Sequence, residues 1–271
     1  MLASVILLSM IELIDTHSHL VYEPLAGDIE NVLARSREAG VAGWINVGTD
    51  PEHNQKAVDM ACKFENMYAA IGVHPHYADQ LNGEIVTELK QLAANEKVIA
   101  IGETGLDFHY NLSKKSEQRR TFEAHLHIAR EMNLPVIIHT REAFDDTMEI
   151  LDNFIRLNGN LKGVVFHCYS ETAERARIIL DYGFYASFTG VVTFKNADTI
   201  RKAAQVVPVE RMMIETDCPY MSPEPMRKQK VNEPALMIHM AKYLAELKNM
   251  ELEDFAAAVT QTSKSFFDLP L

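Results

Sequence analysis

Seven of the eleven histidines lie at or just past the end of a short apolar run. They are His17, His19, His74, His76, His109, His139 and His167. A buried neutral imidazole needs a hydrogen-bond partner, so the six other than His109, which we expect on one face, are hard to explain by packing alone. The other four lie in helical patterns, where we expect surface or satisfied structural roles. These four are His53, His125, His127 and His239.

His17 and His19 form a His-x-His pair on the first apolar run. In a strand, residues two apart point to the same face, so both imidazoles would lie side by side. They repel each other when protonated, and they therefore need either separate partners or a cation between them. A divalent metal ion satisfies both nitrogens at once. The pair alone is only a modest indication of a metal site.

Two carboxylates end later runs, Glu103 in GETGLDF and Asp217 in IETDCPY. Together with four histidines they suit two divalent ions, which we expect Glu103 to bridge. Zn, Mg, Mn and Ni all accept such ligands, so the sequence leaves the metal open. We expect Asp217 to act as a metal ligand and as the general base. Its alternative role is to cap the N-terminus of a helix. Glu215 either pairs with a basic group or packs inside the fold.

Eight apolar runs of six or seven residues position these side chains. They span 11–17, 43–49, 68–74, 98–104, 135–140, 163–169, 184–190 and 211–217. Runs that are apolar almost throughout are typical of parallel strands buried on both faces. The stretches between them have helical spacing; in 116–135, for example, Phe122, Leu126, Ala129 and Met132 lie three or four residues apart.

Alternating strands and helices predict a parallel sheet, and eight such units predict a single (β/α)8 TIM barrel. In that fold the strand ends converge on one mouth, where active sites are found. The alternative is a doubly wound open sheet, which usually has a Gly-rich loop after its first strand. Here that strand is followed by THSHLVYEP. We expect one domain over 10–271, with 1–9 an upstream extension before a true start at Met10 or else a short hydrophobic arm.

Composition excludes several classes of protein. The chain has 271 residues, 47% hydrophobic and 24% charged, with a formal net charge of −12. These values fit a globular protein and exclude disorder, and the acidity argues against non-specific coating of nucleic acid. Three cysteines outside any Cys-x-x-Cys pattern fit a reducing compartment. No apolar run is long enough to span a membrane and no basic signal region is present, so we expect a cytoplasmic location.

The same motifs carry a family resemblance. HSHL, GVHPH, GETGLDF, PVIIHTREAFDDT, VVFHCYS, SFTGVVTFKNA and IETDCPYMSP resemble, in order and spacing, the TatD family of metal-dependent deoxyribonucleases in the amidohydrolase superfamily. The resemblance implies a metal-ligand set of His17, His19, Glu103, His139, His167 and Asp217. His74 and His76 match a family motif, and we expect His74 either to contact the scissile phosphate or to orient a metal ligand.

The resemblance implies hydrolysis of a phosphodiester, with DNA as the substrate. Metal ions lower the pKa of a water toward neutrality, and Asp217 would take its proton. Because an acidic protein repels phosphate at long range, its mouth must be locally positive. We expect Arg141 and Arg227 to contact phosphates there. Metal ions on the floor of a mouth favour exonuclease action on single-stranded or frayed ends. We expect no membrane association and no obligate protein partner.

Two other functions stay open at this stage. A metal-dependent amidohydrolase would cleave a C–N or aminoacyl-ester bond with the same metal ions, because fold does not decide function. A non-catalytic barrel would have lost a ligand, and no ligand position is lost here. Five aromatic residues near the motifs could stack bases or simply pack. They are Tyr77, Phe108, Tyr110, Tyr169 and Tyr220.

Overall fold

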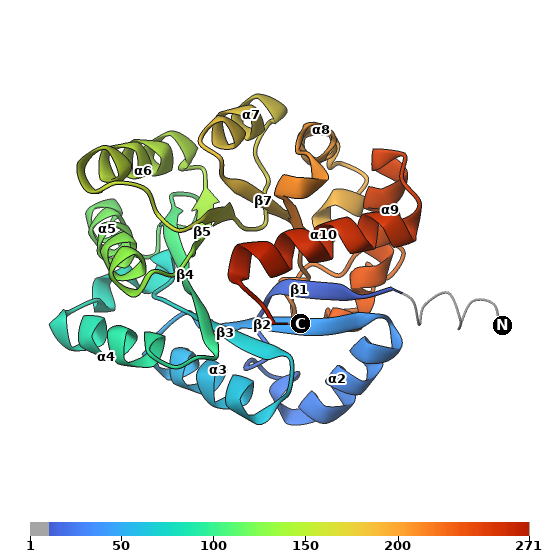
Figure 1. Cartoon of the computed structure of the whole chain (residues 1–271), viewed down its shortest axis with the longest axis horizontal. Coiled ribbons are helices and arrows are strands. Elements are labelled where there is room, and N and C mark those ends of the chain that lie inside the picture. The colour runs from blue at the N-terminus through green and yellow to red at the C-terminus, as the bar shows by residue number, and fades with distance from the viewer. Residues whose placement is uncertain (1–10, 271) are drawn as a thin grey trace. The chain divides into compact units, whose positions relative to one another are not determined.

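The computed structural model describes residues 11–270, in which strands and helices alternate as predicted (Figure 1). The sheet holds eight strands in chain order, β1 to β8. The chain divides into two compact units, 11–46 with 168–270 and 47–167. The proposed start at Met10 lies outside the described residues, and the single domain over 10–271 stays a prediction.

The first unit contains both ends of the described chain. Its strands are β1 (Leu13–Ser18), β2 (Val41–Val47), β7 (Tyr185–Phe188) and β8 (Met212–Ile214). Its α-helices are α2 (Ile29–Glu38), α7 (Ala173–Asp181), α8 (Asp198–Val206), α9 (Met237–Lys248) and α10 (Leu252–Phe267). Short 3-10 turns, η1 (Ala26–Asp28), η3 (Gly190–Thr193), η4 (Val209–Arg211) and η5 (Pro234–Leu236), complete it.

Within this unit the last strand lies beside the first. The Asp217 N–H, just past β8, donates to the His17 carbonyl of β1 at 2.9 Å. Helix α10 lies against β1 (Figure 1), where the Thr260 hydroxyl donates to the Glu12 carbonyl. All six residues of β1 are buried, as expected for a strand covered on both faces. A last strand adjoining the first is the arrangement of a (β/α)8 barrel.

The second unit contains the other four strands. Its strands are β3 (Met67–Ile71), β4 (Val98–Asp107), β5 (Val136–Arg141) and β6 (Val164–Phe166). Its helices are α3 (Pro51–Lys63), η2 (Pro75–Gln80), α4 (Gly83–Ala93), α5 (Lys115–Met132) and α6 (Phe144–Asn158). Neighbouring strands of this unit run parallel.

Strands β4 and β5 approach each other closely at their carboxyl ends. Gly105 pairs with His139, and its φ of +141° lies in a region that favours glycine. A Cβ placed there would lie 2.0 Å from the His139 carbonyl oxygen. Glycine at this position therefore lets the β4 backbone pass directly beside His139.

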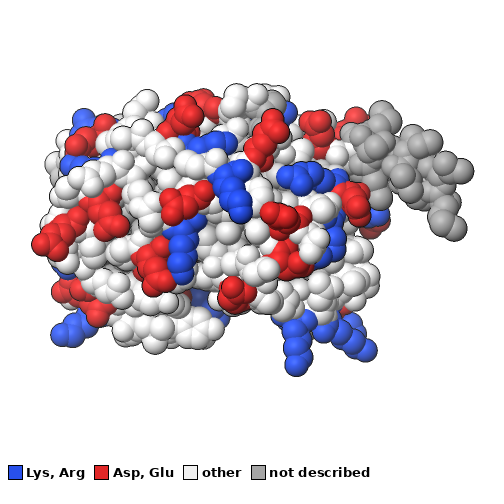
Figure 2. Space-filling view, turned by 90° about the horizontal axis from the view of Figure 1, so that it is seen from below, with Lys and Arg blue, Asp and Glu red and all other residues white. Residues whose placement is uncertain are grey.

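On the surface drawn in Figure 2, Lys and Arg side chains alternate with Asp and Glu. This mixed face fits the expectation that the acidic chain does not grip nucleic acid along a basic stripe. Among residues 11–270, no helix is both long and apolar enough to cross a bilayer.

Candidate metal centre

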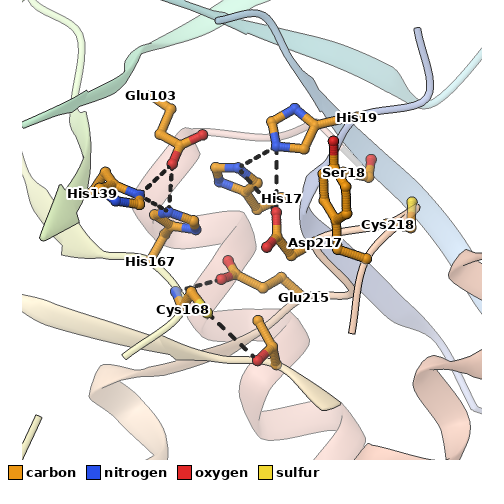
Figure 3. A network of polar contacts seen from close by, with 12 residues as sticks. His17, Ser18, His19, Glu103, His139, His167, Cys168, Glu215, Asp217 and Cys218 are labelled. Carbon is orange, nitrogen blue, oxygen red and sulfur yellow. Dashed lines mark hydrogen bonds and ion pairs between the residues drawn. The ribbon is translucent and has the colours of Figure 1, made fainter. Parts of the chain in front are cut away.

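In the first unit, His17, His19 and Asp217 bring three ligand atoms together (Figure 3). The Nε2 atoms of the two histidines lie 3.3 Å apart. Asp217 Oδ1 lies 3.3 Å from His19 Nε2 and 3.9 Å from His17 Nε2. His17 is fully buried, and the Asp217 side chain is 12% exposed. The predicted His-x-His pair thus converges with the carboxylate from the end of β8.

Backbone geometry turns Asp217 toward the histidines. Its φ of 52° lies in the left-handed region, which a non-glycine residue enters at an energetic cost. The hydrogen bond from its N–H to His17 maintains this turn. One residue earlier, Thr216 donates from both its N–H and its hydroxyl to the buried Asp15 carboxylate, at 2.9 and 2.5 Å. The hydrogen bonds of Asp217 and Thr216 thus hold the end of β8 against β1 next to the cluster.

Glu215 had two open interpretations, and its contacts favour the structural one. Its Oε1 accepts from the Cys168 N–H at 2.6 Å (Figure 3). Its Oε2 accepts from the Ser187 hydroxyl, also at 2.6 Å. The Thr16 hydroxyl also donates to it, at 3.4 Å. The carboxylate is buried and links three segments of the first unit through neutral donors.

In the second unit, Glu103, His139 and His167 form another cluster (Figure 3). Glu103 Oε1 lies 2.8 Å from His139 Nδ1 and 2.7 Å from His167 Nε2, and those two nitrogens are 3.3 Å apart. Burial opposes ionisation of Glu103, but the adjacent His167 and His74 and the hydrogen bond from His139 hold its pKa well below the usual range. Glu103 is therefore an ionised carboxylate at neutral pH.

His74 lies beside this cluster as a neutral donor. Its Nδ1 accepts from the His76 N–H at 3.1 Å, so its ring proton is on Nε2. That Nε2 is 3.4 Å from Glu103 Oε1. Burial, partly offset by the Glu103 charge, lowers the pKa of His74 to about 4. Its geometry allows donation to Glu103 or to a substrate oxygen, so both predicted roles stay open.

Asp107 belongs to this site and was missed by the sequence analysis. Its buried Oδ2 lies 3.1 Å from His139 Nε2 and 3.0 Å from His76 Nε2. Burial opposes ionisation, but hydrogen bonds from His139 and the Tyr110 N–H hold the pKa of Asp107 below its usual range. Its position four residues beyond Glu103 on the same strand is the period-two signal that could have identified it.

Both clusters have the donor set and the spacing of a cation site. Two nitrogens that bind one Zn²⁺ tetrahedrally at about 2.0–2.1 Å are separated by about 3.3 Å. The His17–His19 and His139–His167 nitrogen pairs both show that separation. Imidazole and carboxylate ligands accept Zn²⁺ and other first-row divalent ions. The residues present therefore fit the predicted divalent metal.

Both predicted basic contacts, Arg141 and Arg227, are exposed. Arg141 ends β5, and its guanidinium lies 4.7 Å from the Tyr110 ring centroid. Arg227 is exposed in the first unit and lies over the Phe194 ring at 3.8 Å. His109 pairs with Glu142 at 2.7 Å. Among the helical histidines, His125 is buried and hydrogen-bonded, as expected of a structural residue.

The fold and these clusters define a metal-dependent hydrolase on a (β/α)8 barrel. The family model described as TatD related DNase matches residues 14–268, and the chain belongs to that family. This confirms the resemblance found in the motifs. It also favours the nuclease interpretation over the C–N or aminoacyl-ester alternative. The predicted roles of individual site residues stay predictions.

Relatives extend the comparison over nearly the whole chain. The chain is 39% identical over 255 residues to an uncharacterized metal-dependent hydrolase, YabD, of Bacillus subtilis, covering 94% of this chain and 98% of the relative. It is 34% identical to a protein named 3′-5′ ssDNA/RNA exonuclease TatD from Pantoea ananatis, covering 94% and 99%. The crystal structure of the TatD homolog YJJV from Escherichia coli superposes with a TM-score of 0.89 at 26% identity, covering 95% and 98%. The superposition confirms the predicted barrel.

Proposed function

We propose that this chain is a deoxyribonuclease that removes nucleotides from single-stranded or frayed DNA ends, using two divalent cations. The main observation behind this proposal is that ring nitrogens of His139 and His167 both contact the ionised carboxylate of Glu103. The name of the Pantoea relative supports a single-stranded substrate and attack from the 3′ end.

One cation would be held by His17, His19 and Asp217, and the other by Glu103, His139 and His167. The earlier expectation that Glu103 bridges the two ions stays a prediction. Divalent cations at these groups would acidify a water and offset the negative charge of a phosphodiester. The metal identity stays open among Zn, Mg, Mn and Ni.

The chain's own groups would then complete the reaction. Asp217 accepts the proton of the attacking water, as a carboxylate at a metal site can. The His74 Nε2–H donates to a phosphate oxygen or keeps Glu103 oriented. Arg141 and Arg227 contact flanking phosphates, where a guanidinium can form two parallel hydrogen bonds.

An activity screen tests this function. Protein stripped with a chelator is reconstituted with Mg²⁺, Mn²⁺ or Zn²⁺ and given single-stranded DNA labelled at the 3′ or the 5′ end. A cyclic amide and an aminoacyl-tRNA are offered in parallel. We expect metal-dependent release from the 3′ end and no turnover of the other two substrates. Hydrolysis of the amide or the aminoacyl ester without nuclease activity would overturn the proposal.

Two matched substitutions distinguish loss of the proposed metal site from general destabilisation of the protein. His139→Ala removes a ligand atom 2.8 Å from Glu103. His127→Ala makes the same chemical change on an exposed position of α5. We expect nuclease activity to be abolished in the first variant and kept in the second.

A further inference from the structure

The loop after β4 presents an exposed aromatic ring close to the second cluster. Tyr110 is 54% exposed, whereas Tyr169, another candidate for base stacking, is buried. The Tyr110 ring meets the His76 ring edge to face, with centroids 5.5 Å apart. His76 in turn lies 6.4 Å from the His139 ring. Two ring contacts therefore connect an exposed tyrosine to a proposed metal ligand.

Tyr110 is anchored to the site by the same carboxylate that contacts that ligand. Asp107 Oδ1 accepts the Tyr110 N–H at 2.8 Å, while Oδ2 faces His76 and His139. Asp107 itself is buried, and its own N–H donates to the Gln118 side chain. The hydrogen bond to Asp107 therefore holds the backbone of Tyr110 in place. The Tyr110 ring is exposed because this ordered turn places it at the surface.

The side chain of Arg141 lies over the Tyr110 ring. The Arg141 guanidinium carbon lies 4.7 Å from the Tyr110 centroid. It comes from the end of β5, whose backbone pairs with Asp107. Among residues 11–270, no carboxylate lies within ion-pair distance of this guanidinium. A half-exposed ring with an unpaired cation over one face matches single-stranded nucleic acid, which offers a stacking base next to a phosphate.

We propose that Tyr110 is a stacking platform for a nucleobase of the substrate, adjacent to the bond that is cleaved, and that Arg141 contacts the neighbouring phosphate. This inference rests on the proposed nuclease function and adds a specificity-determining subsite to it. Stacking tolerates any base, because every base has a π face. The subsite therefore selects for an unpaired nucleotide rather than for a sequence.

A series of substitutions tests the contribution of the Tyr110 ring by itself. Tyr110→Ala removes it, and Tyr110→Phe keeps the face while losing the hydroxyl. Leu112→Ala, in the same loop and 69% exposed, controls for shortening an exposed side chain nearby. Each variant is assayed on single-stranded DNA and on an oligonucleotide whose terminal residues are abasic. The abasic substrate keeps the phosphodiesters but offers no base to stack.

For Tyr110→Ala we expect kcat/KM on ordinary DNA to fall about 10- to 100-fold, as loss of one stacking contact predicts. On the abasic substrate the same variant should stay within about twofold of the wild type, because no stacking is lost there. Tyr110→Phe and Leu112→Ala should match the wild type on both substrates. Equal losses on both substrates, or no loss on either, would overturn the proposal.

Binding provides a readout that does not depend on turnover. Fluorescence anisotropy with a cleavage-resistant phosphorothioate oligonucleotide should show the same base-dependent loss of affinity in Tyr110→Ala. If the wild type cleaves no DNA, the proposed function fails. In that case base-independent binding would also refute the subsite, and base-dependent binding through Tyr110 would uphold it.

Discussion

Asp107 Oδ2 accepts from His139 Nε2 at 3.1 Å, on the edge of the ring opposite the nitrogen that faces Glu103. Both carboxylates accept, so the ring donates from Nε2 to Asp107 and from Nδ1 to Glu103. Burial opposes protonation of this ring, but the hydrogen bonds that it donates to Asp107 and Glu103 outweigh burial and raise the pKa of His139. A carboxylate behind a metal-binding histidine typically orients the ligand and increases its basicity.

Asp107→Asn should therefore weaken divalent-metal binding about 10- to 100-fold. The amide is uncharged and has a single acceptor oxygen, so it cannot accept from the two ring N–H groups and from the Tyr110 N–H at the same time. Calorimetric titration of chelator-treated protein with Zn²⁺ or Mn²⁺ measures the effect. Asp59→Asn, on the exposed side of α3, is the matched charge control. Unchanged metal affinity together with a lower melting temperature would assign Asp107 a structural role only.

Asp217→Asn should keep bound metal but lose turnover about 10²- to 10⁴-fold, the usual contribution of a general base. The amide can still ligate through its oxygen but cannot take the proton from water. Metal content by atomic emission and kcat on single-stranded DNA are measured on the same preparation. Wild-type turnover in this variant would refute the predicted role.

Removal of metal should weaken DNA binding at least about tenfold, because an acidic protein attracts phosphate only where local charge is positive. The net charge of −12 disfavours long-range attraction of DNA. Anisotropy of a labelled single strand, with and without chelator, tests this expectation. Tight binding in chelator would contradict it.

Acid should destabilise the fold through His125. Burial, partly opposed by its hydrogen bond to the Thr121 carbonyl, lowers the pKa of His125 to about 4. Between that value and the ordinary 6.5, only the unfolded chain binds the proton. The free energy of unfolding should therefore fall as pH falls through this range, by up to about 1.4 kcal/mol per pH unit.

This stabilisation is fully present above pH 6.5. His125→Gln removes the titrating ring but keeps an acceptor for the Val73 N–H. Urea denaturation across the pH range should show a shallower acid slope for the variant than for the wild type. Identical slopes would show that His125 does not contribute.

Gly105→Ala should destabilise the protein by at least about 2 kcal/mol, because backbone strain and overpacking act together. The added methyl would meet the His139 carbonyl, and φ is +141°. Gly83→Ala is the control, since a Cβ there meets nothing within 4 Å. That variant should be neutral or gain up to about 1 kcal/mol. Thermal unfolding of both variants is compared, and equal stability would argue against a close approach at β4.

The amino-acid sequence alone was sufficient to predict the elements and most of the side chains that converge in the two clusters. Runs buried on both faces are apolar almost throughout, so the strands and their ends are encoded locally. The His17–His19 pair converges because its period-two spacing is a local property of a strand. Strand ends 103 and 217 were also recognisable, because each carries a carboxylate directly after an apolar run.

Tertiary structure decided which side chains contact one another and through which atoms. Asp107 has the period-two spacing of Glu103 on β4, but only the pairing of β4 with β5 shows that it contacts His139. Glu215 could have paired with a basic group, whereas its hydroxyl and N–H partners favour the structural interpretation. Of the five candidate aromatic residues, Tyr110, Tyr77 and Tyr220 are exposed, and Tyr169 is buried. Such contacts join residues far apart in the chain, so local periodicity carries no information about them.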